Sequence, residues 1–136
     1  MKTFHVDIVT PSKTAIDGEV KAITIPGTLG SFQILYNHAP LLSSFEVGQI
    51  KIEDEKGEIK YFATSGGTVE VEDNKVIVLA ESFESPEEID IDRAQQAMNR
   101  AKKRMSKDTD EKEIDILRAE LALQRAINRL KLVKKL

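Results

Sequence analysis

The chain has 136 residues, of which 40% are hydrophobic but only 5% aromatic, and it carries a formal net charge of −3 with a pI near 5.5. It contains no cysteine, which excludes a disulfide framework, a thiol nucleophile and a four-cysteine zinc site. The acidic balance argues against nucleic-acid binding, which usually needs a basic domain. The sequence has no signal peptide and no apolar run long enough to cross a bilayer, so we expect no direct insertion into the membrane.

The charges divide the chain into two parts. Residues 1–85 carry 7 Lys against 13 Asp and Glu, a net of −6, whereas residues 86–136 carry 13 Lys and Arg against 10 Asp and Glu, a net of +3. All six arginines belong to the second part. The hydrophobic periodicity changes at the same point, which predicts two domains, 1–85 and 86–136. An acidic N-terminal part followed by a basic C-terminal part favours a binding or switching protein over an enzyme.

The first part reads as a series of short strands separated by turn signals. Apolar and polar residues alternate from Phe4 to Ile8, and pairs such as Asp17-Gly18 interrupt the runs that follow. The strand-like segments are 4–8, 20–25, 32–36, 50–52, 59–62, 69–71 and 76–79. Some eight short strands at roughly ten-residue spacing predict an antiparallel all-β sandwich or barrel that serves mainly as a scaffold.

A helix start follows this series. Ser85 has the features of a cap, with Pro86 at the first helical position and Glu88 three residues after the serine, while Asp90 is an alternative cap one turn later. Apolar residues then recur at helical spacing within one sector of a helical wheel. They are Ile91, Ala94, Ala97, Met98, Ala101 and Met105.

A second helical pattern runs from about residue 111 to 133. The polar segment 106–110 before it predicts a short loop, so the two helices should form an antiparallel hairpin. The second helix has two apolar faces. The broad face comprises Ile116, Ala119, Leu123, Ala126, Ile127, Leu130 and Val133, and the narrow face comprises Ile114, Leu117, Leu121 and Leu132. One face can pack on the first helix; the other needs the sandwich or another protein, so the pattern fits both a permanently docked hairpin and one that exchanges partners.

The six arginines form two stripes beside these apolar faces. Those on the first helix are Arg93, Arg100 and Arg104, and those on the second are Arg118, Arg125 and Arg129. Each stripe spans about 40° of the helical wheel. The guanidinium fork suits phosphate or carboxylate oxygens, so converging stripes would need an anion. The alternative is a solvated face balanced by neighbouring acids such as Glu88 and Glu120.

Motifs of catalysis are missing from the sequence. The two histidines, His5 and His38, have no second ligand at metal spacing, and no Gly-x-x-x-x-Gly-Lys-Ser/Thr loop exists to bind phosphates. We expect His5 to face solvent from a strand and His38 to satisfy backbone groups at a turn. Neither catalysis by this chain nor a metal site is therefore expected.

Four segments of the first part carry a family resemblance: 30–41, ending in His-Ala-Pro-Leu, then 48–52, 63–71 and 74–80. In their order and spacing, and with the closing hairpin, they resemble the epsilon subunit of the F-type ATP synthase over essentially the whole chain. Tyr36 stands where that family commonly has a proline.

The resemblance implies a sandwich of about ten antiparallel strands followed by a C-terminal antiparallel α-helical hairpin. It implies a non-catalytic rotor subunit of a proton-translocating ATP synthase, peripheral at the cytoplasmic face of a bacterial plasma membrane. The sandwich would bind the gamma subunit and the c-subunit ring. The hairpin would alternate between a folded position on the sandwich and an extended position in the alpha/beta catalytic head, where it restrains ATP hydrolysis.

The segment 89–94, Ile-Asp-Ile-Asp-Arg-Ala, matches the signature Ile/Leu-Asp-x-x-Arg-Ala, which is associated with ATP binding in some bacterial epsilon subunits. Carried over by position, the resemblance implies an ATP site formed by Glu84, Asp90, Arg93, Ala94, Arg100, Arg125 and Arg129. ATP would be a regulatory ligand that stabilises the folded hairpin, and no cofactor would be obligatory.

Two other function classes fit parts of the sequence. A free-standing nucleotide sensor would use the arginines but no partner surface on the sandwich. A membrane-surface binder would use Lys131, Lys134 and Lys135 beside the apolar residues of the C-terminal segment. Purification within a large complex would decide against the first of these, and liposome co-sedimentation tests the second.

Overall fold

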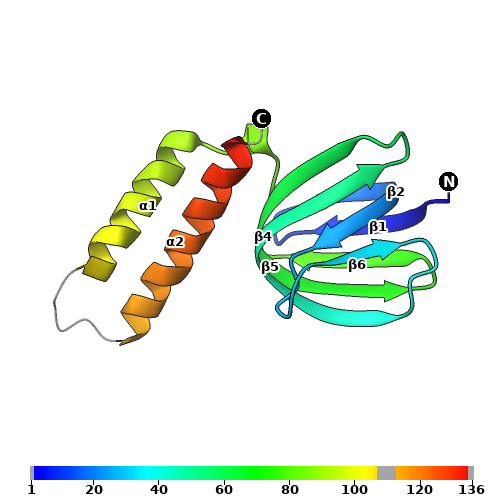
Figure 1. Cartoon of the computed structure of the whole chain (residues 1–136), viewed down its shortest axis with the longest axis horizontal. Coiled ribbons are helices and arrows are strands. Elements are labelled where there is room, and N and C mark those ends of the chain that lie inside the picture. The colour runs from blue at the N-terminus through cyan, green and yellow to red at the C-terminus, as the bar shows by residue number, and fades with distance from the viewer. Residues whose placement is uncertain (1, 107–112, 135–136) are drawn as a thin grey trace. The chain divides into compact units, whose positions relative to one another are not determined.

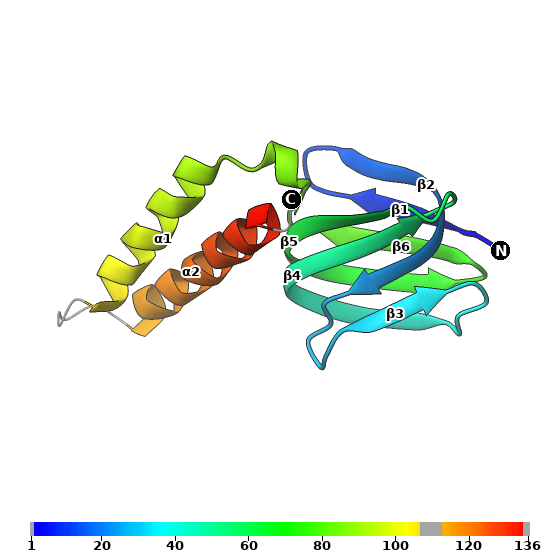
Figure 2. The same cartoon turned by 45° about the horizontal axis from the view of Figure 1, so that its top comes forward.

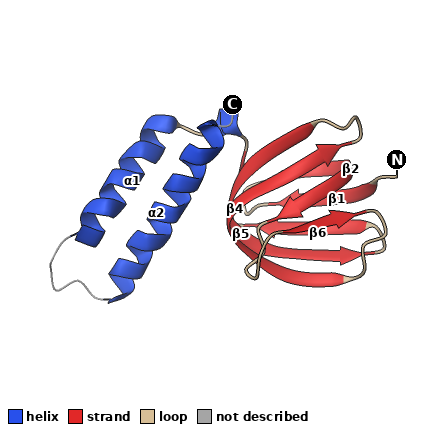
Figure 3. Cartoon of the chain, viewed as in Figure 1, coloured by secondary structure: helices blue, strands red, loops and turns tan. Residues whose placement is uncertain are grey.

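The computed structural model describes residues 2–106 and 113–134, except the side chains of 113 and 114. The chain forms two compact units, Met1–Ser85 and Pro86–Leu136. All the strands belong to the first unit, and both α-helices belong to the second (Figure 3).

The first unit is one sheet that closes on itself. Its strands are β1 (Phe4–Val9), β2 (Thr14–Ile25), β3 (Phe32–Leu35), β4 (Leu41–Asp54), β5 (Ile59–Glu72), β6 (Lys75–Ala80) and β7 (Phe83–Glu84). Their order is β1-β6-β5-β4-β2-β3, β7 pairs with β5, and β1 also pairs with β2 (Figure 1). The pairing of β1 with β2 therefore closes β1, β6, β5, β4 and β2 into a ring around a single core, and β3 extends the sheet from β2.

The prediction of an all-β sandwich is confirmed, but the described residues form seven strands and not about ten, and further details differ. The predicted strands 59–62 and 69–71 are the two ends of β5, because Gly66 and Gly67 continue the strand with positive φ. The pair Asp17-Gly18, which we read as a turn, likewise lies inside β2. A Cβ atom at Gly67 would collide with the Leu79 carbonyl oxygen, so only glycine permits this close approach. In addition, β1 pairs with β6 in parallel, so the sheet is not purely antiparallel.

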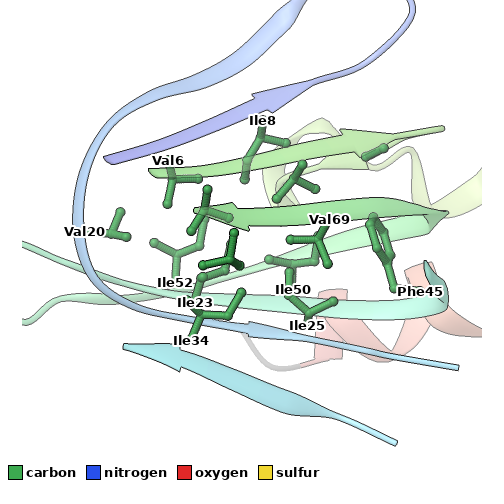
Figure 4. Close-up of a cluster of buried hydrophobic side chains, with 14 of the residues drawn as sticks. Val6, Ile8, Val20, Ile23, Ile25, Ile34, Phe45, Ile50, Ile52 and Val69 are labelled. Atoms are coloured by element: carbon green, nitrogen blue, oxygen red, sulfur yellow. The ribbon is translucent and has the colours of Figure 1, made fainter. Parts of the chain in front are cut away.

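The core consists mainly of aliphatic side chains on the inner positions of the strands (Figure 4). On β1 the inner residues Phe4, Val6 and Ile8 are buried, as the period-2 alternation predicts. Side chains from all the other strands, β2 to β7, complete the cluster. Phe62 of β5 stacks on Phe83 of β7 with 4.3 Å between ring centroids, which attaches the last strand to the sheet.

The second unit is a helical hairpin. It contains a short 3-10 helix, η1 (Pro86–Glu88), followed by α1 (Ile91–Ser106) and α2 (Glu113–Lys134), and the two α-helices run antiparallel (Figure 2). The segment after Ser85 forms the 3-10 turn and Asp90 caps α1, so the second of the two predicted starts is the one the structure adopts. Among the described residues, neither helix combines the length and hydropathy needed to span a membrane.

Alanines form the seam between the two helices. Ala94 and Ala101 of α1 are buried, as are Ala119 and Ala126 of α2, and within each helix the two are seven residues apart. Because the helices are antiparallel, this shared spacing lets the two alanines of α1 come opposite the two alanines of α2 in reverse order. Small side chains at these points allow the two backbones to approach closely.

The two predicted apolar faces of α2 are only partly covered. On the broad face Ala119 and Ala126 are buried, but Ile116 is 41% exposed. On the narrow face Leu132 is buried, whereas Leu117 and Leu121 are 54% and 41% exposed. The side chain of Ile114, which we placed on the narrow face, lies outside the described residues.

Candidate anion-binding site

Asp90 acts as the N-cap of α1. Its Oδ1 accepts a hydrogen bond from the backbone N–H of Arg93 at 3.1 Å, and its carbonyl oxygen accepts one from the N–H of Ala94 at 3.0 Å. An N-cap satisfies a backbone donor that the first turn leaves without a partner. The Asp and the Arg of the signature are therefore joined by the geometry of a helix start, which fixes where Arg93 emerges.

Ala94 lies in the helix seam. It is 4% exposed on the face that α1 turns toward α2, so the packing of the hairpin accounts for a small residue at this position. The described hairpin leaves almost no surface of Ala94 for contact with an adenine ring.

The arginines follow the seam in a regular way. Arg93, Arg100, Arg118 and Arg125 each precede one of the four buried alanines by one residue. One residue is a rotation of about 100° in an α-helix, so each arginine stands at the same rotational offset from the seam. When two helices are antiparallel, equal offsets place both stripes on the same side of the hairpin. We call this side, formed by those four residues and Arg129, the arginine face.

The arginine stripes run in opposite order along the antiparallel hairpin. Arg93 near the start of α1 and Arg125 in the last part of α2 lie toward one end of it, and Arg100 and Arg118 lie toward the other end. Arg129 follows Arg125 by one turn. On α1 the arginines are exposed, whereas Arg125 and Arg129 are half-buried. The antiparallel arrangement thus puts Arg93, Arg100, Arg125 and Arg129 on the same side of the hairpin, and their role as an ATP site stays a prediction.

Glu84 does not belong to the arginine face, whereas Arg118 is an additional member of it. Glu84 is half-buried in β7, paired in register with Ala63, and belongs to the first unit, which is described by itself. Arg118 is not among the residues carried over from the family signature, yet it has the same relation to the seam as the others. The Arg-Ala pairs at 93, 100, 118 and 125 are the sequence signal that identifies it.

A second group of polar side chains lies on the sandwich. His5 Nε2 is 2.8 Å from Asp17 Oδ1 and 3.2 Å from Asp7 Oδ1, and His5 Nδ1 is 3.1 Å from Glu19 Oε2. His5, Asp7 and Asp17 bring ring nitrogen and carboxylate oxygen atoms within 4.8 Å of one another. Sequence spacing did not reveal it, because Asp17 and Glu19 come from the neighbouring strand β2.

The environment of His5 shifts its pKa. Desolvation lowers the pKa, but hydrogen bonds to Asp7 and Glu19 and the charges of Asp7 and Asp17 outweigh desolvation, so the pKa is raised from 6.5. The other histidine, His38, has its Nδ1 2.7 Å from the Ala39 carbonyl oxygen, in agreement with a role at a turn.

Comparison with known proteins gives matches over both units. The family model described as ATP synthase, Delta/Epsilon chain, beta-sandwich domain matches residues 3–86, and the one described as ATP synthase, Delta/Epsilon chain, long alpha-helix domain matches residues 87–134. The chain is 44% identical over 104 residues to the ATP synthase epsilon chain of Desulfitobacterium hafniense (strain Y51), covering 76% of this chain and 78% of that one. It is 47% identical over 108 residues to the ATP synthase epsilon chain of Pelotomaculum thermopropionicum, covering 79% and 80%.

Solved structures share the fold. A chain of the Euglena gracilis mitochondrial ATP synthase, in a structure of OSCP, F1 and the c-ring in rotational state 1, is similar with a TM-score of 0.82 and 22% identity. The similarity covers 95% of this chain and 79% of that one. A chain of the Tetrahymena thermophila mitochondrial ATP synthase, from the central stalk and c-ring, is similar with a TM-score of 0.66 and 17% identity over 97% of both chains.

Proposed function

The chain belongs to the delta/epsilon chain family of ATP synthase, and from this premise we propose that its arginine face binds ATP and thereby controls the position of the helical hairpin. Members of this family are non-catalytic stalk subunits of the ATP synthase. The chain therefore serves ATP synthesis as part of a rotary complex and performs no catalysis itself.

The sandwich attaches the chain to the stalk. Within the proposal it binds the gamma subunit and rests on the c-subunit ring, at the cytoplasmic face of the membrane. Exposed apolar side chains on the first unit support a role in partner binding: Leu29 is fully exposed, and Leu42 is 76% exposed.

The observation that carries the ATP proposal is the repetition of Arg-Ala pairs along the seam. The repetition places Arg93, Arg100, Arg118 and Arg125 on one face, where like charges repel unless an anion lies among them. A triphosphate offers many acceptor oxygens to guanidinium forks, and each charge-assisted hydrogen bond contributes about 1.5–3 kcal/mol.

ATP would act by stabilising the closed hairpin, in which α1 and α2 pack against each other along the alanine seam. Both arginine stripes lie on one side only while the alanine seam is formed, so an anion that contacts both helices binds the closed hairpin in preference to an open one. A ligand shifts such an equilibrium by its difference in affinity for the two states. The exposed Leu117 and Leu121 supply an apolar surface that an extended hairpin could bury in the alpha/beta catalytic head, where it would restrain ATP hydrolysis.

Calorimetric titration of ATP into the full chain tests the proposal. We expect saturable binding by the wild type, weakened at least about tenfold by Arg93→Ala or Arg125→Ala, since tenfold corresponds to about 1.4 kcal/mol, the loss of one charge-assisted contact.

The matched controls are Lys102→Ala on α1 and Lys131→Ala on α2. Both lysines are exposed and lie on the opposite side of the helical wheel from the arginine stripes, so each variant removes one charge without changing the arginine face. The controls should bind ATP as the wild type does. If the wild type gives no binding, or the lysine variants lose as much affinity as the arginine variants, the specific ATP site is refuted; the arginine face would then be a candidate surface for an acidic partner segment.

A further inference from the structure

The pairing of β1 with β2, which closes the sheet of the first unit, carries the His5 group on its outer surface. In the register of these two antiparallel strands, His5 lies opposite Glu19 and Asp7 lies opposite Asp17. Two carboxylates directly opposite one another destabilise a strand pair. The closing pair therefore contains a repulsion that a positive charge between the strands would remove.

The hydrogen-bond geometry of His5 requires that positive charge on the ring itself. Nδ1 faces Glu19 Oε2, and Nε2 faces oxygens of both Asp7 and Asp17. Ionised carboxylates only accept hydrogen bonds, so both ring nitrogens must donate, and only the imidazolium form has an N–H on each nitrogen. In the neutral form one nitrogen would turn its lone pair toward a carboxylate.

We propose that protonated His5 is a proton-dependent link between β1 and β2, whose loss of charge at alkaline pH weakens the closure of the sheet. The charged groups that face His5 are Asp7 on its own strand, Asp17 and Glu19 on β2, and Lys75, its register partner on β6. The three carboxylates favour the imidazolium and Lys75 opposes it. The raised pKa of His5 agrees with the dominance of the carboxylates.

The direction of the pH effect follows from linkage. Because the pKa of His5 is higher in the folded than in the unfolded state, its contribution to stability is fully present below 6.5 and is lost as the pH rises through the folded-state pKa. The link is thus strongest below pH 6.5 and weakens as the pH rises above that value.

The test combines two measurements on the full chain. An NMR titration of the His5 ring should give a pKa above 6.5 in the wild type and a lower value in Asp17→Asn, a variant at a side chain that is 65% exposed. In denaturant unfolding, the wild type should be more stable than His5→Gln at about pH 6, and this difference should shrink toward zero by about pH 9. His38→Gln serves as the control and should keep the wild-type profile.

Three outcomes would overturn the proposal. The first is a His5 pKa at or below 6.5 in the folded wild type. The second is a difference between wild type and His5→Gln that does not change with pH. The third is a pH dependence that disappears when EDTA is present, because a bound metal ion and not a proton would then join the two strands. If His5→Gln fails to fold, the titrations of the wild type and Asp17→Asn still decide the question.

Discussion

The sandwich and the seam between the two helices bury side chains of very different size, although α2 also buries Leu132. The sheet closes around a cluster of Ile, Val and Phe side chains, many of which are fully buried. The seam of the hairpin instead consists of four alanines, and large apolar residues such as Leu117 and Leu121 remain exposed on α2. Since burial of an Ile or Val side chain contributes about 1.5–3 kcal/mol and alanine has little surface to bury, the sandwich should be much the more stable unit.

This difference matches the two tasks of the proposed function. A unit that holds the chain in a rotating stalk needs a fixed structure, whereas a unit that changes position needs contacts that are easily broken and remade. A seam of small side chains brings the arginine stripes close together but contributes little hydrophobic free energy. We therefore expect an anion on the arginine face to contribute substantially to the closed hairpin.

The largest effect should come from a truncation in the sandwich core. Ile50 is fully buried, so Ile50→Ala should reduce the free energy of unfolding by about 2–5 kcal/mol. The matched truncation Leu121→Ala removes the same number of carbon atoms from an exposed side chain on α2 and should change the stability by no more than about 0.5 kcal/mol. Denaturant unfolding measures both, and equal losses would contradict the contrast between the two units.

An intermediate effect should follow from a larger side chain in the seam. Ala126 is buried between the helices, so Ala126→Leu should force them apart and cost the hairpin about 1–3 kcal/mol. The same residue introduced by Gln124→Leu lies on an exposed side of α2 and should leave the hairpin intact. Thermal melting followed by far-UV circular dichroism compares them. A hairpin that tolerates Ala126→Leu as well as Gln124→Leu would not be held by an alanine seam.

The smallest effect should arise at the helix cap. Asp90→Ala removes the acceptor of the Arg93 N–H and should destabilise α1 by about 0.5–2 kcal/mol, measured as lost helicity, while Asp90→Ser should retain most of the cap. The serine variant also separates two roles of this position. If Asp90 only caps the helix, Asp90→Ser binds ATP as the wild type does. Loss of ATP binding in that variant would instead give the carboxylate a direct role at the nucleotide.

The sequence predicted the class of each unit because its local patterns reflect the packing directly. The alternation from Phe4 to Ile8 reports one buried side of β1, and the recurrence of Ala94 and Ala101 at seven-residue spacing reports the helix seam. The length of the strands was harder to predict. Gly66 and Gly67 signal a turn in most sequences, and only the pairing of β5 with its neighbours keeps the chain extended there.

The arginine face was predictable in outline, whereas the His5 group was not. The stripes follow from a helical wheel, and their convergence follows from the antiparallel arrangement of the helices. Proximity of His5 to Asp17 and Glu19 depends on the register between β1 and β2, and a slip of one residue would place these carboxylates on the other face. Hydrophobic alternation alone does not fix which residue of one strand lies opposite which residue of the other.

Hydrogen exchange of the full chain, with and without ATP, tests most directly whether an anion closes a weakly packed hairpin beside a stable sandwich. We predict that amides of α1 and α2 exchange faster than those of β4 and β5 in the absence of ATP. Addition of ATP should slow the exchange of both helices in the wild type, leave the strands unchanged, and have no effect in Arg93→Ala. A hairpin as protected as the sandwich without nucleotide, or one whose exchange ATP does not alter, would contradict this account.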